Sequence, residues 1–276
     1  MMRLLLCTDL DRTLIPNGIH PESPMARKRF ERLVCRDEVT LAYVTGRHLA
    51  LIEQAIADFG LPQPDFAIAD VGTTIYQVGS SGWGQLDEWD AEIAPDWRGM
   101  SRDDIYNLLN VFPALRLQEQ EKQNRHKLSF YVPLETDIPI LIAEMDTRLR
   151  HANIKANLVW SIDEKAGVGL MDILPASANK LHAIHFLMKQ KGFDHKNTVF
   201  AGDSGNDLDV LMSDIPAVLV ANADAEVKNM VASANKDSIY IARGGYLGMN
   251  GNYSAGILEG AAHYWPEVDT WLRDIN

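Results

Sequence analysis

The segment LLLCTDLD, residues 4–11, joins a short apolar run to two carboxylates. An apolar run of this length is typical of a buried strand of a parallel sheet, and Asp9 follows where the run stops. Residues two apart at a strand end, where the chain leaves extended geometry, can both project into one crevice. The segment therefore predicts a parallel sheet with Asp9 and Asp11 at the carboxyl end of its first strand.

Helical and apolar segments alternate on both sides of a central block. The expected strands are residues 4–6, 40–44, 66–69, 170–174, 199–201, 217–220 and 239–241. The expected helices are residues 23–33, 48–59, 178–191, 223–232 and one from about Asn206. Such alternation predicts an α/β fold, a doubly wound, Rossmann-like parallel sheet with ligands at the carboxyl ends of its strands.

The rhythm changes after Tyr76, where a glycine- and serine-rich passage begins. Beyond it we expect a helix at 101–110 with Ser101 as N-cap, a strand at 127–132, a helix at 138–149 and a strand at 154–162. This order predicts a small α+β cap with an antiparallel sheet, at residues 84–164. The core domain would then be discontinuous, comprising residues 1–83 and 165–276.

The acid pair has a chemical use. One carboxylate can attack phosphorus while its neighbour transfers protons, which gives an aspartyl-phosphate route. A solvated acidic turn is the alternative for Asp9 and Asp11 alone.

A second acidic segment, GDSGND at residues 202–207, follows another apolar strand. Carboxylate oxygens are the ligands that Mg²⁺ prefers, so Asp203 is expected to bind the metal directly. Asp207 lies one helical turn further on and is expected to orient a water or Lys180. We expect Asp209 and Asp214 to be solvated charges.

Two further segments suggest phosphate binding. Thr45-Gly46-Arg47 stands at the end of a strand and the start of a helix, where a hydroxyl and free amides can hold a phosphate. Lys180 begins a helix after the expected strand at 170–174. Each is common alone, but together with the acid pairs they fall at four expected strand ends.

These four motifs resemble those of the haloacid-dehalogenase-like phosphatases with a cap of the second type, over the whole chain. The chain is most similar to the sucrose-phosphate phosphatase family, in residues 5–11, 41–47, 71–76 and 202–207, and more loosely in 127–131 and 255–259. Arg12 departs from that pattern, which usually has asparagine there; this could alter how the cap closes.

The resemblance implies an Mg²⁺-dependent phosphomonoesterase that converts sucrose 6-phosphate into sucrose and phosphate. Asp9 is the expected nucleophile and Asp11 the acid and base. The expected metal ligands are Asp9, Asp11 (through its backbone carbonyl), Asp203 and Asp207. The expected phosphate-binding residues are Thr45, Gly46, Lys180 and Asn206.

The cap would select the sugar. The polar run that leads into its strand at 127–132 is either a solvated loop or a set of sugar-binding donors, of which Gln123, His126, Lys127, Ser129 and Tyr131 are the candidates. Trp83, Trp89 and Trp97 could stack on a sugar or pack the protein. His182 and His185, spaced i, i+3, could bind a metal but lack a third ligand nearby in sequence, so a structural role is favoured.

Other functions are disfavoured by composition or motif. The 276 residues carry a formal net charge of −12, which argues against general binding of nucleic acid or anionic membranes. The two cysteines cannot build a disulfide framework. No signal peptide or membrane span is predicted, so a cytoplasmic location is expected. The protein is also expected to be a monomer. The alternatives kept open are a phosphatase of another phosphosugar or glycosyl-glycerate phosphate, a phosphosugar mutase and a phospho-aspartate signalling receiver; Asp11 argues against the receiver.

Overall fold

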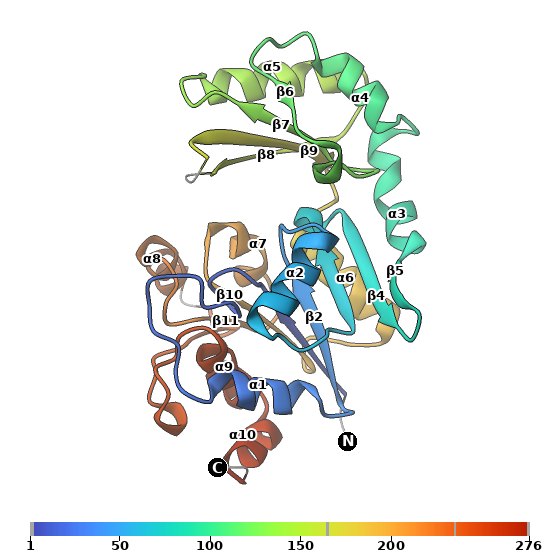
Figure 1. Cartoon of the computed structure of the whole chain (residues 1–276). Helices are drawn as coiled ribbons and strands as arrows, with labels where there is room; N and C mark the ends of the chain where they lie inside the picture. The colour runs from blue at the N-terminus through green and yellow to red at the C-terminus, as the bar shows by residue number, and fades with distance from the viewer. Residues whose placement is uncertain (1–2, 164–165, 235, 275–276) are drawn as a thin grey trace.

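The computed structural model describes residues 3–163, 166–234 and 236–274, and in them the chain forms two sheets, one above the other in Figure 1. The larger sheet has the strand order β12-β11-β10-β1-β2-β3-β4-β5. Its first six strands are parallel, while β4 and β5 are antiparallel to their neighbours. Their bounds are β1 Leu4–Thr8, β2 Val39–Val44, β3 Phe66–Ala69, β4 Thr74–Gly79, β5 Gly82–Gln85, β10 Thr198–Gly202, β11 Ala217–Leu219 and β12 Ile239–Ile241. The predicted doubly wound α/β core is confirmed.

Helices cover both faces of this sheet. The side chains of β1 point alternately to the two faces, so each face carries apolar groups that helices bury. Leu4 and Leu6 face one apolar cluster, and Leu5 and Cys7 face the other. The first cluster is closed by α1 (Ala26–Val34), α2 (Leu49–Phe59), α9 (Ser254–Tyr264) and α10 (Pro266–Asp274). The second is closed by α3 (Asp87–Ile93), α6 (Lys180–Lys191), α7 (Leu208–Leu211) and α8 (Ala225–Ala234).

The second sheet is antiparallel, in the order β6-β7-β9-β8. Its strands are β6 (Arg116–Leu117), β7 (Leu128–Val132), β8 (Ala156–Asp163) and β9 (Val168–Pro175). The helices α4 (Arg102–Leu109) and α5 (Ile138–His151) pack on the face of this sheet that is remote from the core. We call this sheet with its two helices the cap. Ser101 caps α4 in a reciprocal bond with Asp104, as expected.

One expected core strand belongs to the cap instead. Residues 170–174 lie in β9, which pairs with β7 and β8 along its length. Only three of the four motifs therefore follow strands of the core. The fourth, Lys180, begins α6, just after the chain returns from the cap. The boundary expected at residues 164–165 lies outside the described residues. With β9 included, we propose that the cap ends near Pro175.

A second difference concerns the passage after Tyr76. Its glycines and serines predicted a loop, whereas β4 and β5 form a hairpin that extends the large sheet. Glycine at position 82 has a φ of 101°, which L-residues rarely adopt, and it follows the turn between the two strands.

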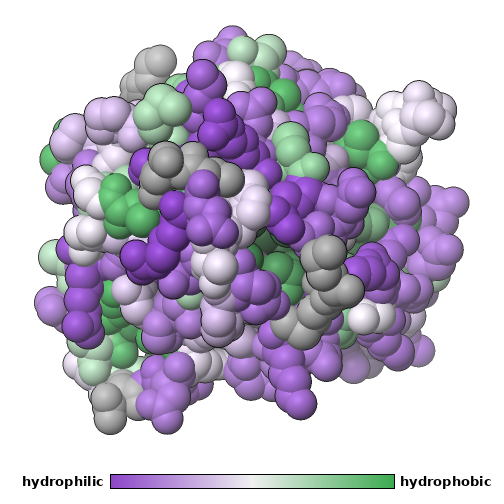
Figure 2. Space-filling view, turned by 90° about the horizontal axis from the view of Figure 1, so that it is seen from below, coloured by the Kyte–Doolittle hydropathy of each residue, from purple (hydrophilic) through white to green (hydrophobic). Residues whose placement is uncertain are grey.

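Hydrophilic residues dominate the face of the molecule remote from the cap, with hydrophobic residues in small scattered groups between them (Figure 2). None of the helices in the described ranges is long and apolar enough to cross a membrane.

Candidate active site

Polar side chains gather at the carboxyl ends of three neighbouring strands. Asp9 follows β1, Thr45 follows β2 and Asp203 follows β10. Because these strands are adjacent and parallel, their carboxyl ends lie at one edge of the sheet, the edge that faces the cap. Asp9, Thr45 and Asp203 are all buried.

Lys180 ties this edge to α6. Its Nζ atom donates to Asp9 Oδ1 at 2.9 Å and to Asp207 Oδ1 at 2.7 Å. The three side chains are almost inaccessible to water. Electrostatic attraction to the two carboxylates holds the buried ammonium group of Lys180 in this position. The expected proximity of Lys180 to Asp207 is thus present in the structure.

Asp207 also holds the loop after β10. Its Oδ2 atom accepts hydrogen bonds from the backbone N–H groups of Asp203 and Ser204. Glycine is required at position 202 because a Cβ atom there would lie 2.7 Å from Asp207 Oδ2. Asp207 therefore orients both Lys180 and the loop that carries Asp203.

The buried carboxylates of Asp9, Asp203 and Asp207 form a cluster whose ligand atoms lie within 4.8 Å of one another. Burial, with the Asp207 carboxylate beside it, raises the pKa of Asp203 to about 6. Burial also raises the pKa of Asp9 to about 8, although Lys180 opposes the shift. Carboxylates with raised pKa values in a buried cluster are the environment in which a divalent cation lowers the electrostatic cost.

The donor set suits such a cation. Asp203 Oδ2 is buried and accepts no hydrogen bond from the described residues, while Oδ1 accepts one from the Thr13 hydroxyl. The Arg12 guanidinium lies 3.3 Å from Asp203 Oδ2 and also pairs with Asp224. Arg12, the departure from the family pattern, thus contacts the acidic cluster rather than the cap. Three carboxylates fit a hard, oxygen-preferring ion such as Mg²⁺.

Asp11 stands apart from this cluster. Its carboxylate accepts two hydrogen bonds from the Arg47 guanidinium, at 2.8 and 2.7 Å, and one from Asn17 at 2.7 Å. Burial works against ionisation here, but the hydrogen bonds from Arg47 outweigh it and lower the pKa of Asp11. Arg47 is part of the quoted Thr-Gly-Arg segment, yet sequence reasoning assigned it no role.

The other expected phosphate-binding residues are differently placed. The Thr45 hydroxyl accepts a hydrogen bond from the Arg47 backbone N–H, at the turn into α2. A Cβ atom at Gly46 would meet only Val71, at 3.8 Å. Asn206 is exposed, and its side-chain oxygen accepts a hydrogen bond from the Ser204 hydroxyl.

The cap contributes a second polar group, centred on Lys127. Its Nζ atom lies 3.7 Å from Asp70 of the core and 3.9 Å from Asp172 of β9. Ser129 is fully buried, and its hydroxyl donates to Asp172. Leu128 and Phe130 of β7 pack in the cap's apolar cluster, whereas Ser129 between them contacts Asp172. Lys127 therefore lies where cap and core meet.

The remaining cap candidates are largely engaged within the cap. Gln123 bonds through both side-chain atoms to the backbone around Ser129. The Tyr131 hydroxyl donates to Glu119 and accepts from Lys122. His126 is buried, and its Nδ1 atom lies 3.5 Å from Asp90. A cavity of about 530 Å³ is lined by Gln123 and His126 together with residues from the start of α4. None of the buried core carboxylates lines it.

Two of the three tryptophans pack the protein. Trp89 is buried between β4 and α6 and donates its ring N–H to the Gly72 carbonyl. Trp97 is buried in the apolar cluster of the cap. Trp83 is partly exposed and packs edge-on against Tyr76.

The chain belongs to the sucrose-6F-phosphate phosphohydrolase family, whose sequence model matches residues 2–265. It is 52% identical, over 98% of its length and 74% of the relative's, to a Nitrosococcus oceani protein described as a HAD-like hydrolase. It is 30% identical over 99% of its length to tobacco sucrose-phosphatase 1 and spans 62% of that protein.

Solved structures share the fold. A sucrose-phosphatase from Synechocystis, in complex with sucrose and phosphate, superimposes with a TM-score of 0.73 at 26% identity. The match covers 96% of this chain and 98% of that one. A haloacid dehalogenase-like hydrolase from Bacillus subtilis, at 19% identity and a TM-score of 0.68, covers 95% of this chain and 92% of its own. The fold is therefore HAD-like, and the family makes the chain a phosphatase.

Proposed function

We propose that this protein is an Mg²⁺-dependent phosphomonoesterase that hydrolyses a sugar phosphate through an aspartyl-phosphate intermediate. The observation that carries the proposal is the buried contact of Lys180 with Asp9 and Asp207, beside Asp203, at the strand edge that faces the cap. Cationic and anionic groups held at one strand edge are suited to bind a phosphoryl group beside a nucleophile.

Asp9 is the nucleophile in this proposal. Its carboxylate oxygen attacks phosphorus, the bond to the sugar oxygen breaks, and the phosphoryl group is carried on Asp9 until water hydrolyses it. Lys180 donates to Asp9 Oδ1, so it fixes the orientation of the carboxylate and offers positive charge to the phosphoryl oxygens. Thr45 supplies a hydroxyl at the neighbouring strand end.

Asp11 transfers the protons. The Arg47 pair keeps Asp11 ionised in the free protein, the form that deprotonates the attacking water in the second step. In the first step Asp11 must protonate the leaving oxygen. We propose that the anionic substrate draws Arg47 toward itself, which removes the stabilisation of the Asp11 carboxylate and lets it take up a proton.

Asp9, Asp203 and the Asp11 backbone carbonyl would hold Mg²⁺, with Asp207 acting on Asp203 and Lys180 from behind. When bound, the ion neutralises charge that develops on the transferring phosphoryl group. In its absence, the buried Asp9 and Asp203 retain raised pKa values, and an incoming phosphate meets three carboxylates whose charge only Lys180 and Arg12 offset.

We propose sucrose 6-phosphate as the substrate. The family match and the likeness to a sucrose-phosphatase solved with sucrose and phosphate support this choice. The groups at the strand edge meet only the phosphoryl group, so selectivity must come from the cap, where Lys127 and Asp172 face the core. A site that pairs hydroxyls leaves its own polar groups unsatisfied when a smaller substrate enters.

A phosphatase acting on another glycosyl phosphate is the second candidate. A glucosylglycerol-phosphate synthase of Pseudomonas anguilliseptica is 26% identical over 222 residues of the chain, which makes glycosylglycerol phosphates worth testing. A mutase would need to retain a doubly phosphorylated intermediate, and a signalling receiver would stay labelled, so continuous phosphate release in the assay below would exclude both.

The decisive experiment measures phosphate release from a panel of sugar phosphates with Mg²⁺ and again in excess chelator. We expect sucrose 6-phosphate to give the highest kcat/KM, ahead of glucose 6-phosphate, fructose 6-phosphate, glucosylglycerol phosphate and glucosylglycerate phosphate. Asp9→Asn is the control for contaminating phosphatase. A higher kcat/KM for a glycosylglycerol phosphate would transfer the assignment to that substrate, and full activity without metal would refute the metal requirement.

The role of the cap is tested with Lys127→Met. We expect it to lower kcat/KM for sucrose 6-phosphate by tenfold or more relative to a generic aryl phosphate. Lys189→Met, an exposed lysine on α6, is the matched control. An equal loss on both substrates would assign Lys127 to holding cap and core together instead.

A further inference from the structure

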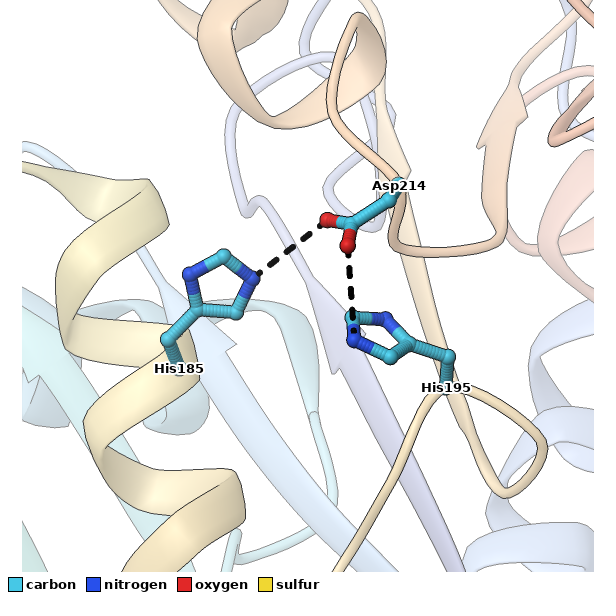
Figure 3. Close-up of side chains that lie close together, drawn as sticks. All are labelled: His185, His195 and Asp214. Atoms are coloured by element: carbon cyan, nitrogen blue, oxygen red, sulfur yellow. Dashed lines mark ion pairs between the residues drawn. The ribbon is translucent and has the colours of Figure 1, made fainter.

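A group of two histidines and one aspartate lies on the core outside the candidate active site. His185 is on α6, His195 is in the segment between α6 and β10, and Asp214 is between α7 and β11. Figure 3 shows the two imidazole rings converging on the Asp214 carboxylate, one toward each oxygen. His185 Nε2 lies 3.7 Å from Asp214 Oδ1, and His195 Nε2 lies 3.5 Å from Oδ2.

The spacing of these atoms fits a metal ion. One ligand atom from each residue can be chosen so that all three lie within 4.8 Å of one another. Bonds of about 2.0–2.2 Å to a tetrahedral Zn²⁺ place its ligand atoms about 3.3–3.6 Å apart. The two histidine–carboxylate separations are close to that value, so rotations of the partly exposed side chains would bring the three atoms to bonding distance.

From this geometry we infer that His185, His195 and Asp214 form a binding site for a transition-metal dication of the Zn²⁺ class. Two imidazole nitrogens and one carboxylate oxygen favour Zn²⁺, and other metals that bind imidazole, over Mg²⁺ or Ca²⁺, which take oxygen ligands. The three side chains are partly or largely exposed, which leaves the remaining coordination positions to water.

Neighbouring groups leave the imidazoles available to the ion. His182, one turn before His185 on α6, is occupied elsewhere: its Nδ1 atom contacts the Ser177 carbonyl, and its Nε2 atom lies 3.4 Å from Glu92. Burial lowers the pKa of His185, which favours the neutral imidazole that ligates metals. The His185 and His195 rings meet edge to face, with centroids 6.0 Å apart.

A bound ion would join segments that also carry the candidate active site. Lys180 begins α6, five residues before His185, and α7 lies between Asp207 and Asp214. The ion would cross-link these segments on the core, so its expected effect is on the stability of the fold. The inference does not depend on the proposed phosphatase function.

The test uses the full chain, freed of metal and then titrated with Zn²⁺ by calorimetry and with Co²⁺ by visible absorption. Millimolar Mg²⁺ is present to occupy the acidic cluster. We expect one equivalent of Co²⁺ to bind with the visible bands of a nitrogen-ligated site of low coordination number. Zn²⁺ should displace it and raise Tm.

Substitutions of single residues test whether His195 and Asp214 bind the ion. His195→Ala and, independently, Asp214→Asn should weaken Zn²⁺ binding at least tenfold, with circular dichroism unchanged because both side chains are largely exposed. His151→Ala, an exposed histidine on the cap, and Asp203→Asn in the acidic cluster should keep the Co²⁺ bands. Undiminished Zn²⁺ affinity in His195→Ala and Asp214→Asn would overturn the inference. Failure of the wild-type chain to bind Zn²⁺ up to millimolar concentration would also overturn it and leave the group as ion pairs.

Discussion

Asp203→Asn should have opposite effects on the protein with and without metal. In the metal-free protein the Asp203 carboxylate is buried beside Asp207, which raises its pKa from 3.8 to about 6. At pH 7.5 the group is ionised in both the folded and the unfolded chain, so the folded state bears the cost of the shift. At about 1.4 kcal/mol per unit of pKa, that cost is about 3 kcal/mol. Asparagine is neutral and can still accept the hydrogen bond from Thr13.

We therefore expect Asp203→Asn to stabilise the chelated protein at pH 7.5. Each kcal/mol moves Tm by about 2–4 °C in a chain of this size, so the increase should be about 6–12 °C. The sign of the pH dependence follows from the same shift. Because the pKa is raised on folding, the wild-type chain loses stability relative to the variant as pH rises from about 4 to 6, and below about pH 4 the two should converge.

Mg²⁺ should reverse the order. At a free concentration one thousand times its Kd, a ligand that binds only the folded chain stabilises it by about 4.1 kcal/mol, which exceeds the about 3 kcal/mol by which the variant is favoured in chelator. Wild type should gain this and Asp203→Asn should not. The assay is thermal and denaturant unfolding of both proteins in chelator and in Mg²⁺, at pH 4 and 7.5, with Asp209→Asn as the exposed control. A chelated variant less stable than wild type, or an equal response to Mg²⁺, would refute the reasoning.

Four further results are expected. Asp9→Asn should abolish phosphate release from sucrose 6-phosphate with the fold intact by circular dichroism, because an amide is a very poor nucleophile; residual activity near wild type would reassign the nucleophile. Lys180→Met should lower the free energy of unfolding by about 3–5 kcal/mol, measured in urea, because it leaves two buried carboxylates unpaired; unchanged stability would contradict the electrostatic role of the contact. Arg47→Met should move to higher pH the basic limb of the kcat/KM profile, on which Asp11 loses the proton that it needs as the acid of the first step, since Asp11 loses the hydrogen bonds that lower its pKa; an unmoved basic limb would contradict the role of Arg47 in setting that pKa. Gly260→Ala should cost about 1–3 kcal/mol despite its better helix propensity, because its Cβ would lie 2.1 Å from Val218; Gly205→Ala, with open space around its Cβ position, is the control, and equal stability of the two variants would oppose the packing argument.

Much of the core could be predicted because buried parallel strands are written as short apolar runs. The runs that end before Asp9, Thr45 and Asp203 correspond to β1, β2 and β10, and strand adjacency brings these residues to one edge. The helices of the cap were predictable from apolar residues at helical spacing. Ser101 was predictable as the N-cap of α4 because a serine side chain can accept a hydrogen bond from the backbone of the first helical turn. Apolar runs, helical spacing and N-caps all involve residues that lie close together in the sequence, which is why they can be recognised without the tertiary structure.

Pairing partners were harder to predict. The apolar pattern of residues 170–174 identifies a strand, but the same pattern suits a core or a cap sheet, and only pairing with β7 and β8 places it in the cap. The β4–β5 hairpin was not predicted, because its glycines and serines have low strand propensity. Ser129, a residue expected to bind sugar, lies in β7, and its hydroxyl is bound to Asp172, a residue 43 positions away.

The sequence alone indicated the kind of chemistry, because carboxylates and a hydroxyl at the ends of strands belong together only if those strands form one sheet. Tertiary structure decided which groups pair. It placed Lys180 between Asp9 and Asp207, Arg47 on Asp11, and His195 and Asp214 beside His185. The physical reason is that charge pairs and metal ligands act over a few ångströms of space, whereas sequence patterns report only the periodicity and burial of each segment.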